Sequence, residues 1–346
     1  MNKSEMRSPT IREVAKLARV GVMTVSRVIN NHPSVRPSTR KRVEAAIIQL
    51  GYRQNEAARL LKGGRAKIIG LIVPDLSDAF FASCAHTVQH LARASGYMTL
   101  VASSERDEEL EVQEAELMAS RQISGLLIVT SVHKGSERLR KLQSPDFPIV
   151  GFDRPIPGLE TDAVLVENRS GAEGAVRHLV EHGHKRIACV GYDSNVYTVH
   201  ERVQGYLDEM RSAGLGADIS LDMVSIDDVR QWVAATMAKS NRPTAIFSLN
   251  HRTSSFLLQA LSEKKVRVPD EIAMVGFDDF ELASVVTPAL TTVSQSPVDL
   301  ARRAMTLLIE RIRRAKNAVQ EPAAKIMLPT QLILRASCGV HPVTRR

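Results

Sequence analysis

Along most of the chain, short apolar runs alternate with amphipathic stretches of helical length. The first run, KIIGLIVP, is almost continuously apolar and ends at Pro74, which is typical of a parallel strand buried on both faces. Later strands are predicted in GYMTLVAS, ISGLLIVT, FPIVGFD, RIACVGY, DMVSI, AIFSL and IAMVGFDD. Helices are predicted around residues 80–95, 107–121, 169–182, 200–213, 227–239 and 252–264. This alternation predicts a doubly wound α/β body with two similar halves.

The first fifth of the chain has a different pattern, that of three short helices. Thr10 and Glu13 have the spacing of a capping box at the start of the first helix. A tight turn leads to a second helix over residues 22–30, and a third is predicted over residues 38–50 with Gly51 after its last turn. Two short helices joined by a few residues and backed by a third are typical of a helix-turn-helix domain.

The second helix, within GVMTVSRVIN, has an apolar side and a polar side. Taken alone, it fits either a buried helix of an enzyme or a recognition helix in a DNA groove. Charge favours the second interpretation. Residues 1–67 carry 15 Lys and Arg against four acids, whereas the remainder carries 31 against 34. A basic excess confined to one segment indicates a polyanionic partner such as DNA, although a merely solvated basic face remains the alternative.

Composition restricts the class and the compartment. At 346 residues the chain is too long for one small core, and its 44% hydrophobic and 24% charged residues are ordinary for a globular protein. Its three cysteines are odd in number and widely spaced, which argues against a disulfide framework. No secretory signal and no apolar run of about 18 residues is present, so we expect a cytoplasmic protein with no membrane partner.

Several motifs occur in the order and at the spacing of one known family. REVA, TVSRVIN, LGY and the N..AR.L..G pattern of residues 55–64 lie in the basic segment. The body adds IIGLIVPDLSDAFF, FPIVGFDR, HLVEHGHKRIACVG, RPTAIFSLN, VRVPDEIAMVGFDD and PALTTVSQS. Together, over roughly residues 9–340, they closely resemble the lactose-repressor/galactose-repressor (LacI/GalR) family of transcription factors.

The resemblance implies a small all-α helix-turn-helix head plus a hinge helix, followed by an α/β periplasmic-binding-protein-like body of two doubly wound subdomains. The expected boundaries are 1–52 for the head, 53–65 for the hinge helix and 66–346 for the effector-binding and dimerisation domain. Within the body, the N-subdomain would comprise about 66–166 and 297–324, and the C-subdomain about 167–293 and 325–341. A homodimer on a pseudo-palindromic double-stranded operator, controlled by a small-molecule effector, is also implied.

The resemblance also assigns DNA-binding residues. In the family, the two residues before the TVSR motif discriminate between bases, and here they are Val22 and Met23, which could contact DNA only through apolar surface such as a thymine methyl, or simply pack. Arg27 matches a base-contacting arginine that can bind guanine O6 and N7. Leu61 matches a hinge residue that wedges into the minor groove. The full expected set is Thr10, Val22, Met23, Thr24, Ser26, Arg27, Asn30, His32, Asn55, Ala58, Arg59 and Leu61.

Effector-binding positions follow from the ends of the predicted strands and from the resemblance. Arg202 and Asp278 are expected to hold polar groups of a ligand or to pair with each other. The full expected set is Asp75, Phe80, Phe81, Asp153, Tyr197, Arg202, Asn250 and Asp278. This chain departs from the family at Asp78-Ala79, where Asn-Pro is frequent, and at His251, where Asp is frequent. The implied ligand class is a sugar, sugar acid or nucleoside, acting as inducer or co-repressor.

Other functions find little support in the sequence. No Gly-x-Ser-x-Gly motif, phosphate-binding loop or dinucleotide fingerprint follows a strand, so we do not expect an enzyme or a cofactor. His178 and His182 share a helical face, but the sequence suggests no third ligand, so no metal is expected. The chain ends without Leu heptads, which favours a dimer over a coiled-coil tetramer. We therefore predict a nucleoid-associated, DNA-binding transcriptional regulator, most simply a repressor.

Overall fold

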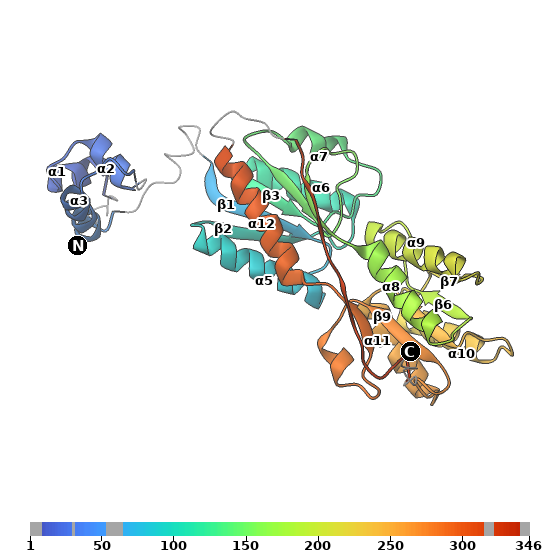
Figure 1. Cartoon of the computed structure of the whole chain (residues 1–346). Helices are drawn as coiled ribbons and strands as arrows, with labels where there is room; N and C mark the ends of the chain where they lie inside the picture. Colours follow the sequence, from blue (N-terminus) through green and yellow to red (C-terminus); the bar gives the residue numbers. More distant parts are fainter. Residues whose placement is uncertain (1–8, 30–31, 53–64, 315–321, 340–346) are drawn as a thin grey trace, which may run out of the picture. The chain divides into compact units, whose positions relative to one another are not determined.

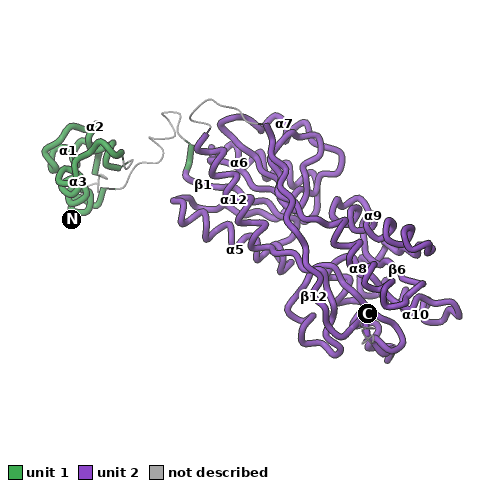
Figure 2. The backbone as a smooth tube through the Cα atoms, viewed as in Figure 1, with its two compact units in different colours: residues 1–66 green, residues 67–346 purple. Residues whose placement is uncertain are grey.

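The computed structural model describes residues 9–29, 32–52, 65–314 and 322–339 of the 346. The chain divides into two compact units, residues 1–66 and residues 67–346, which Figure 2 shows in separate colours. Among the described residues, none of the helices combines the length and the apolar character that a membrane span requires.

The first unit contains three helices, α1 (Ile11–Leu17), α2 (Val22–Ile29) and α3 (Pro37–Leu50). The predicted capping box is present, since the Thr10 side chain accepts from Glu13 N–H and the Glu13 carboxylate accepts from Thr10 N–H. α3 begins one residue before its prediction, because proline is well suited to the first turn of a helix. It ends at Gly51, whose φ of 60° is a left-handed conformation that glycine adopts readily.

A small apolar core holds these three helices together. Val14 from α1, Val25 from α2 and Val43 from α3 are each fully buried, and Val28 and Ala46 are nearly so. The 3.6-residue period of the sequence places these side chains on the inner face of each helix. The polar side of α2 is therefore left at the surface.

The second unit contains two six-stranded sheets, each covered by helices on both faces (Figure 1). The sheet of the N-subdomain has the order β11-β5-β4-β3-β1-β2, and its pairings β1–β2, β3–β4, β4–β5 and β5–β11 are parallel. Its strands are β1 (Ala66–Val73), β2 (Met98–Ser103), β3 (Ile123–Ile128), β4 (Ile149–Phe152), β5 (Asp162–Val166) and β11 (Lys325–Leu328). Helices α5 (Ala79–Ala94) and α12 (Pro297–Arg314) pack on one face, while α6 (Glu108–Ser120) and α7 (Glu137–Leu142) pack on the other.

The sheet of the C-subdomain has the order β12-β10-β9-β8-β6-β7, in which only the β10–β12 pairing is antiparallel. Its strands are β6 (Ile187–Val190), β7 (Asp218–Ser220), β8 (Ala245–Ser248), β9 (Ala273–Phe277), β10 (Thr291–Ser294) and β12 (Gln331–Ile333). Helices α8 (Asn168–Glu181) and α9 (Tyr197–Ser212) cover one face, and α10 (Ile226–Met237) and α11 (His251–Glu263) cover the other. A 3₁₀ turn (Glu281–Ser284) follows β9.

Two details of the prediction were wrong. We placed residues 325–341 in the C-subdomain, but Lys325–Leu328 forms β11 and pairs with β5 of the N-subdomain. The final crossing between subdomains therefore lies between Leu328 and Gln331. We also expected a strand in DMVSI, whereas β7 ends at Ser220 and Ser225 already caps α10. Its side chain accepts from Asp228 N–H, and such a cap begins a helix rather than continuing a strand.

Candidate functional site

Helix α2 presents a mixed surface to solvent at its N-terminal end. Met23 is 70% exposed and Val22 is 42% exposed, although both are apolar. Arg27 is also exposed, and its side chain makes no hydrogen bond or ion pair with the described residues. Thr24 and Ser26 are half-buried on the same helix. α2 therefore has apolar and basic groups in position to contact an external surface.

The segment after α2 is held by an arginine from α3. Arg40 donates from Nη1 to Val28 O at 3.3 Å and from Nη2 to His32 O at 2.9 Å. The exposed His32 lies with Nδ1 2.8 Å from Ser34 Oγ. Thr10 lies at the start of α1, where its hydroxyl donates to Glu13. Of the other expected DNA contacts, Asn30, Asn55, Ala58, Arg59 and Leu61 lie outside the described residues.

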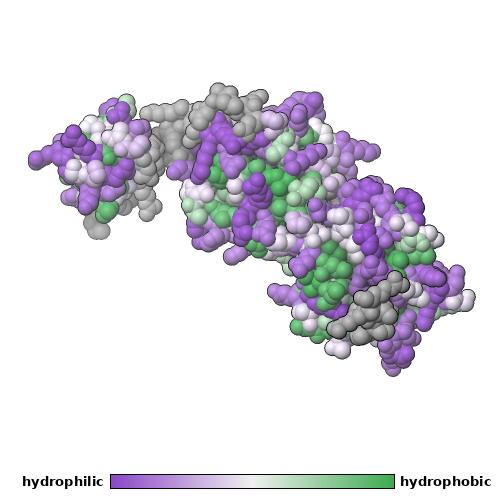
Figure 3. Space-filling view, viewed as in Figure 1, coloured by the Kyte–Doolittle hydropathy of each residue, from purple (hydrophilic) through white to green (hydrophobic). Residues whose placement is uncertain are grey.

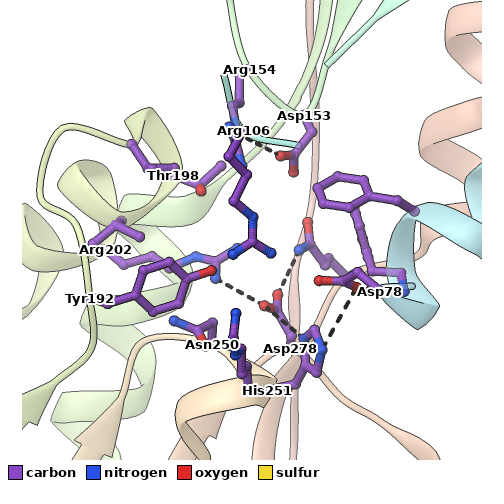
Figure 4. A pocket seen from close by; sticks show the side chains of 16 residues that line it. Asp78, Arg106, Asp153, Arg154, Tyr192, Thr198, Arg202, Asn250, His251 and Asp278 are labelled. Atoms are coloured by element: carbon purple, nitrogen blue, oxygen red, sulfur yellow. Dashed lines mark hydrogen bonds and ion pairs between the residues drawn. The ribbon is translucent and has the colours of Figure 1, made fainter. Parts of the chain in front are cut away.

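A cavity of about 60 Å³ lies between the two subdomains of the body (Figure 4). The N-subdomain contributes the start of α5, the loop after β2 and the turn after β4. The C-subdomain contributes the start of α9, the start of α11 and the ends of β9 and β10. The lining residues are Asp78, Phe80, Phe81, Arg106, Asp153, Arg154, Tyr192, Val196, Thr198, Val199, Arg202, Asn250, His251, Arg252, Asp278 and Gln295. Most of these carry polar or charged groups, so the cavity suits a small polar molecule.

On the C-subdomain side, Asp278 is the centre of a hydrogen-bonded network. Arg202 donates from Nη1 to Asp278 Oδ2 at 3.1 Å, and Gln295 donates from Nε2 to Asp278 Oδ1 at 2.6 Å. Arg202 is itself fixed, since it also donates to Asn168 Oδ1 and Leu249 O. Burial alone would raise the pKa of Asp278, but Arg202 and His251 outweigh it and lower that pKa to about 2. Asp278 is therefore an ionised, fully paired carboxylate.

Asp153 on the N-subdomain side has a different environment. Its nearest cation is Arg154, with Nε 3.4 Å from Oδ2, and the carboxylate accepts no hydrogen bond from the described residues. Burial raises the pKa of Asp153, although Arg154 and Arg202 oppose that shift. Asp78, which caps α5 by accepting from Phe80 N–H, also has a pKa raised by burial. The N-subdomain wall thus holds carboxylates with unfilled acceptor capacity.

His251 links the two walls. Its Nε2 lies 3.7 Å from Asp78 Oδ1 across the cleft, and its Nδ1 lies 3.9 Å from Asp278 Oδ2 on its own side. Burial lowers the pKa of His251, but the attraction of Asp278 and Asp78 is larger in sum and raises it. The imidazole therefore lies between carboxylates of both subdomains, as the dashed lines of Figure 4 show.

Among the described residues, three buried side-chain atoms of residues that line this cavity make no hydrogen bond. They are Asn250 Nδ2, Gln295 Oε1 and Arg154 Nε. Other atoms of two of these side chains are engaged, because Asn250 Oδ1 caps α11 at Thr253 N–H and Arg154 Nη1 donates to Thr130 O. Buried polar groups without a hydrogen bond are costly, and these three belong to residues that line one cavity.

Six of the eight expected effector-binding residues line this cavity: Phe80, Phe81, Asp153, Arg202, Asn250 and Asp278. Arg202 and Asp278 pair with each other, one of the two outcomes expected from the sequence. Asp75 does not line it, because its carboxylate pairs with Arg106 and accepts from Ser77. Tyr197 instead lines a neighbouring cavity of about 360 Å³ that shares Arg154 and Val196 with the first.

Several lining residues were not among the expected effector contacts, and position in the chain could have indicated some of them. Arg154 directly follows Asp153, and His251 directly follows Asn250, so both lie at strand ends where ligands bind in such folds. Gln295 follows β10, a strand that we did not predict. Arg106 lies beyond β2, and its Cζ is 5.8 Å from the centre of the Tyr192 ring of the other subdomain. Only the folded chain brings these two residues together.

The folded chain thus belongs to the class of regulators that join a helix-turn-helix head to a two-subdomain ligand-binding body. Residues 10–55 match the family described as bacterial regulatory proteins, lacI family, and residues 176–338 match the periplasmic binding protein-like domain. The regulator DegA of Bacillus subtilis is 31% identical over 334 residues, covering 95% of this chain and 97% of DegA. The repressor PurR of Haemophilus influenzae is 32% identical over 332 residues, covering 95% and 98%.

Among solved structures, a complex of the transcriptional regulator CelR with cellobiose is 28% identical, has a TM-score of 0.68 and covers 95% of this chain and 99% of its own. The chain belongs to the LacI family of bacterial transcriptional regulators. It is a DNA-binding regulator rather than an enzyme, and its relatives include named repressors.

Proposed function

We propose that the chain is a homodimeric repressor of a pseudo-palindromic operator on the nucleoid, and that a small polyhydroxylated molecule in the cleft sets its operator affinity. The observation that carries the ligand assignment is the set of three buried atoms that make no hydrogen bond with the described residues. Asn250 Nδ2 and Arg154 Nε are donors, whereas Gln295 Oε1 is an acceptor. A hydroxyl group both donates and accepts, so a sugar can satisfy all three atoms. We prefer a sugar to the nucleoside that the resemblance also allowed, because most polar groups of a sugar are hydroxyls, whereas a nucleoside also carries a base.

The charges around the cavity support the same ligand class. Asp153 and Asp78 have acceptor capacity for sugar hydroxyls, while the exposed Arg106 and Arg252 could bind the carboxylate of a sugar acid. The CelR structure, which contains cellobiose, is a precedent for a sugar in this kind of body. We infer that the effector is a sugar or a sugar acid.

In the head, we propose that the N-terminal end of α2 enters the major groove. Arg27 would bind a guanine, and Met23 and Val22 would contact thymine methyl groups. Thr10, Thr24, Ser26, Asn30 and His32 would contact phosphates and fix the register without specifying sequence. Asn55, Ala58, Arg59 and Leu61 remain proposed hinge contacts on the strength of the family resemblance.

An exposed sheet edge supports the homodimer. β2 is the edge strand of its sheet, and its outward side chains Met98 and Leu100 are 73% and 43% exposed. Figure 3 shows hydrophobic residues grouped on the surface of both subdomains. Because exposed apolar edge strands favour association, we propose that a second copy of this chain covers β2. Analytical ultracentrifugation of Met98→Asp should show a shift towards monomer, and an unchanged dimer would exclude β2 from the interface.

The ligand proposal is tested by thermal unfolding with a panel of sugars, sugar acids and nucleosides. Asn250→Ser keeps a residue that caps α11 well but removes the unpaired donor. A sugar or sugar acid should raise the unfolding midpoint of the wild type, and by much less in Asn250→Ser, because ligand binding stabilises only the native state. Gln259→Ala, an exposed change on the same helix, is the matched control. A response to nucleosides alone, or an equal shift in Asn250→Ser, would contradict the proposal.

The DNA proposal is tested on an operator selected from a random DNA library with the full chain. Arg27→Ala should weaken binding to that operator by roughly 10- to 100-fold, the value of one bidentate base contact. Arg42→Ala, an exposed change on α3, should alter specific and non-specific binding to a similar extent. An Arg27→Ala variant that still prefers the selected operator as strongly as the wild type would remove Arg27 from base recognition.

A further inference from the structure

The C-terminal end of α8 carries two histidines that the effector pocket does not use. His178 and His182 are one helical turn apart and lie on the same face of α8, with ring centres 4.0 Å apart. The sequence alone suggested no third metal ligand beside them. The fold supplies one, because Cys338 in the segment after β12 lies against the same turn of α8.

The cysteine is 160 residues from His178 along the chain, yet His178 Nε2 lies 3.1 Å from Cys338 Sγ. One ligand atom from each of His178, His182 and Cys338 lies within 4.8 Å of the other two. In the part of the chain that the structure describes, no other group of three His, Cys, Asp or Glu side chains converges in this way. Cys338 is buried and both histidines are half-buried, so the group is a pocket of ligands rather than a solvated patch.

We propose that His178, His182 and Cys338 bind a Zn²⁺ ion. Zinc–nitrogen bonds of about 2.0 Å and zinc–sulfur bonds of about 2.3 Å place tetrahedral ligand atoms about 3.3–3.6 Å apart. The observed separations, 3.1 Å between His178 Nε2 and Cys338 Sγ and at most 4.8 Å among the three ligand atoms, are close to that spacing. Two imidazoles and one thiolate are a donor set that zinc prefers, and the fourth position is left for water.

The Cys338 thiol donates to Arg335 O at 3.8 Å, and a hydroxyl beside it could donate to the sulfur once the thiol proton is lost. Thr291 Oγ1 lies 3.3 Å from Cys338 Sγ and accepts from Arg335 N–H, so its own hydroxyl hydrogen is available to donate to sulfur. Such contacts orient a ligand and stabilise its charge. On binding, the thiol proton is released to solvent, the sulfur lone pair forms the zinc bond, and any proton on a ligating imidazole nitrogen leaves as well.

Zinc at this position would have a structural effect. It would join the segment after β12 to the end of α8, whose first residue, Asn168, holds Arg202 at the cleft. The site therefore stabilises the C-subdomain, and it does not depend on the identity of the effector or of the operator.

The chain contains its own control for this site. His86 and His90 on α5 have the same spacing of four residues and are both exposed, but no cysteine of the described residues is grouped with them. Any metal that binds to this second pair lacks sulfur coordination. Absorption that arises from a sulfur-to-metal transition therefore reports on the α8 site alone.

Metal-free, reduced full-length protein should be titrated with Co²⁺, a spectroscopic substitute for Zn²⁺. We expect one Co²⁺ per chain with intense visible bands of tetrahedral cobalt and a thiolate-to-cobalt charge-transfer band, both bleached by added Zn²⁺. His182→Gln should weaken Co²⁺ binding by roughly 10- to 100-fold or more, and Cys338→Ser should abolish the charge-transfer band. His90→Gln should leave both signals unchanged.

The unfolding midpoint provides a second readout, since Zn²⁺ should raise it in the wild type and in His90→Gln but much less in His182→Gln. If Cys338→Ser does not fold, His182→Gln alone decides the question. A wild-type protein without the charge-transfer band, or a His182→Gln variant with undiminished affinity, would show that these residues form only a hydrogen-bonded cluster.

Discussion

The tetrapeptide VGFD occurs twice in the body, once at the end of β4 and once at the end of β9. Both copies end in an aspartate with a left-handed backbone, φ 64° at Asp153 and φ 69° at Asp278. Each aspartate also donates its N–H to a carbonyl of the next strand of its sheet at 2.9 Å. The pKa values of the two carboxyls nevertheless shift in opposite directions, upward at Asp153 and downward at Asp278.

The difference arises from partners that are distant in sequence. Asp278 receives hydrogen bonds from Arg202 and Gln295 and the charge of His251, whereas Asp153 has only the imperfectly aligned Arg154. Identical local sequence therefore determines the backbone, while tertiary contacts determine the charge and the task of each carboxylate. In our account, Asp278 is a structural anchor of the pocket and Asp153 is an acceptor for the ligand.

The largest expected effect is on stability, when the aspartate of each VGFD segment is replaced by asparagine. Asp278→Asn removes the charge that compensates the buried Arg202, and breaking a buried ion pair in this way costs about 3–5 kcal/mol of unfolding free energy. Asp153→Asn should cost less than about 1 kcal/mol, because no hydrogen bond from the described residues is lost. Urea unfolding of the two variants makes the comparison. Equal losses of stability would show that the two aspartates are equivalent anchors.

Asp153→Asn, which should cost little stability, should have a large effect on ligand affinity. With the strongest sugar or sugar acid from the thermal panel, Asp153→Asn should weaken binding by roughly 10- to 100-fold, the value of a hydrogen bond to a charged group. Isothermal titration calorimetry measures this directly on a variant that retains wild-type stability. Undiminished affinity in Asp153→Asn would mean that the ligand does not contact this carboxylate.

The two aspartates should contribute to the pH dependence of the unfolding free energy with opposite signs. The pKa of Asp278 is lowered from 3.8 to about 2, so its ionised form contributes stability that is present above about pH 4 and is lost as the pH falls towards 2. Asp153 has a raised pKa, so its ionisation lowers stability as the pH rises above about 4. Asp278→Asn should therefore flatten the acid side of the stability profile, and Asp153→Asn should steepen it. Identical profiles in both variants would refute the assignment.

The smallest expected effect concerns His251, which bridges Asp78 and Asp278. Because its pKa is raised above 6.5, protonated His251 contributes stability that is fully present below about pH 6.5 and is lost as the pH rises through the folded-state value. The ion pairs are 3.7 and 3.9 Å long, so we expect about 1 kcal/mol or less. Between pH 6 and 8, the free energy of unfolding measured in urea should fall with rising pH in the wild type but not in His251→Gln. A decline that persists in His251→Gln would assign it to another group.

The sequence predicted the regular elements well where their signals are local. Each of the six predicted helices of the body begins within three residues of its predicted start, because apolar period and capping residues act over a few positions. The helices α7 and α12 and the strands β5, β10, β11 and β12 were not predicted. The segments of β11 and β12, of four and three residues, acquire their pairing only from β5 and β10. The same limit applies to the pocket, where the strand ends indicated Asp153 and Asp278 but not the Gln295 bond or the His251 bridge.

The most direct test of the account is one binding measurement on the selected operator. The affinity of full-length protein for fluorescently labelled operator is measured with and without the sugar or sugar acid that stabilises it. We predict that the ligand changes the operator Kd by tenfold or more, on the order of typical allosteric coupling, and that Asp153→Asn abolishes the change at the same ligand concentration. A ligand that saturates the cleft and leaves the operator Kd unaltered would contradict the claim that this pocket controls DNA binding.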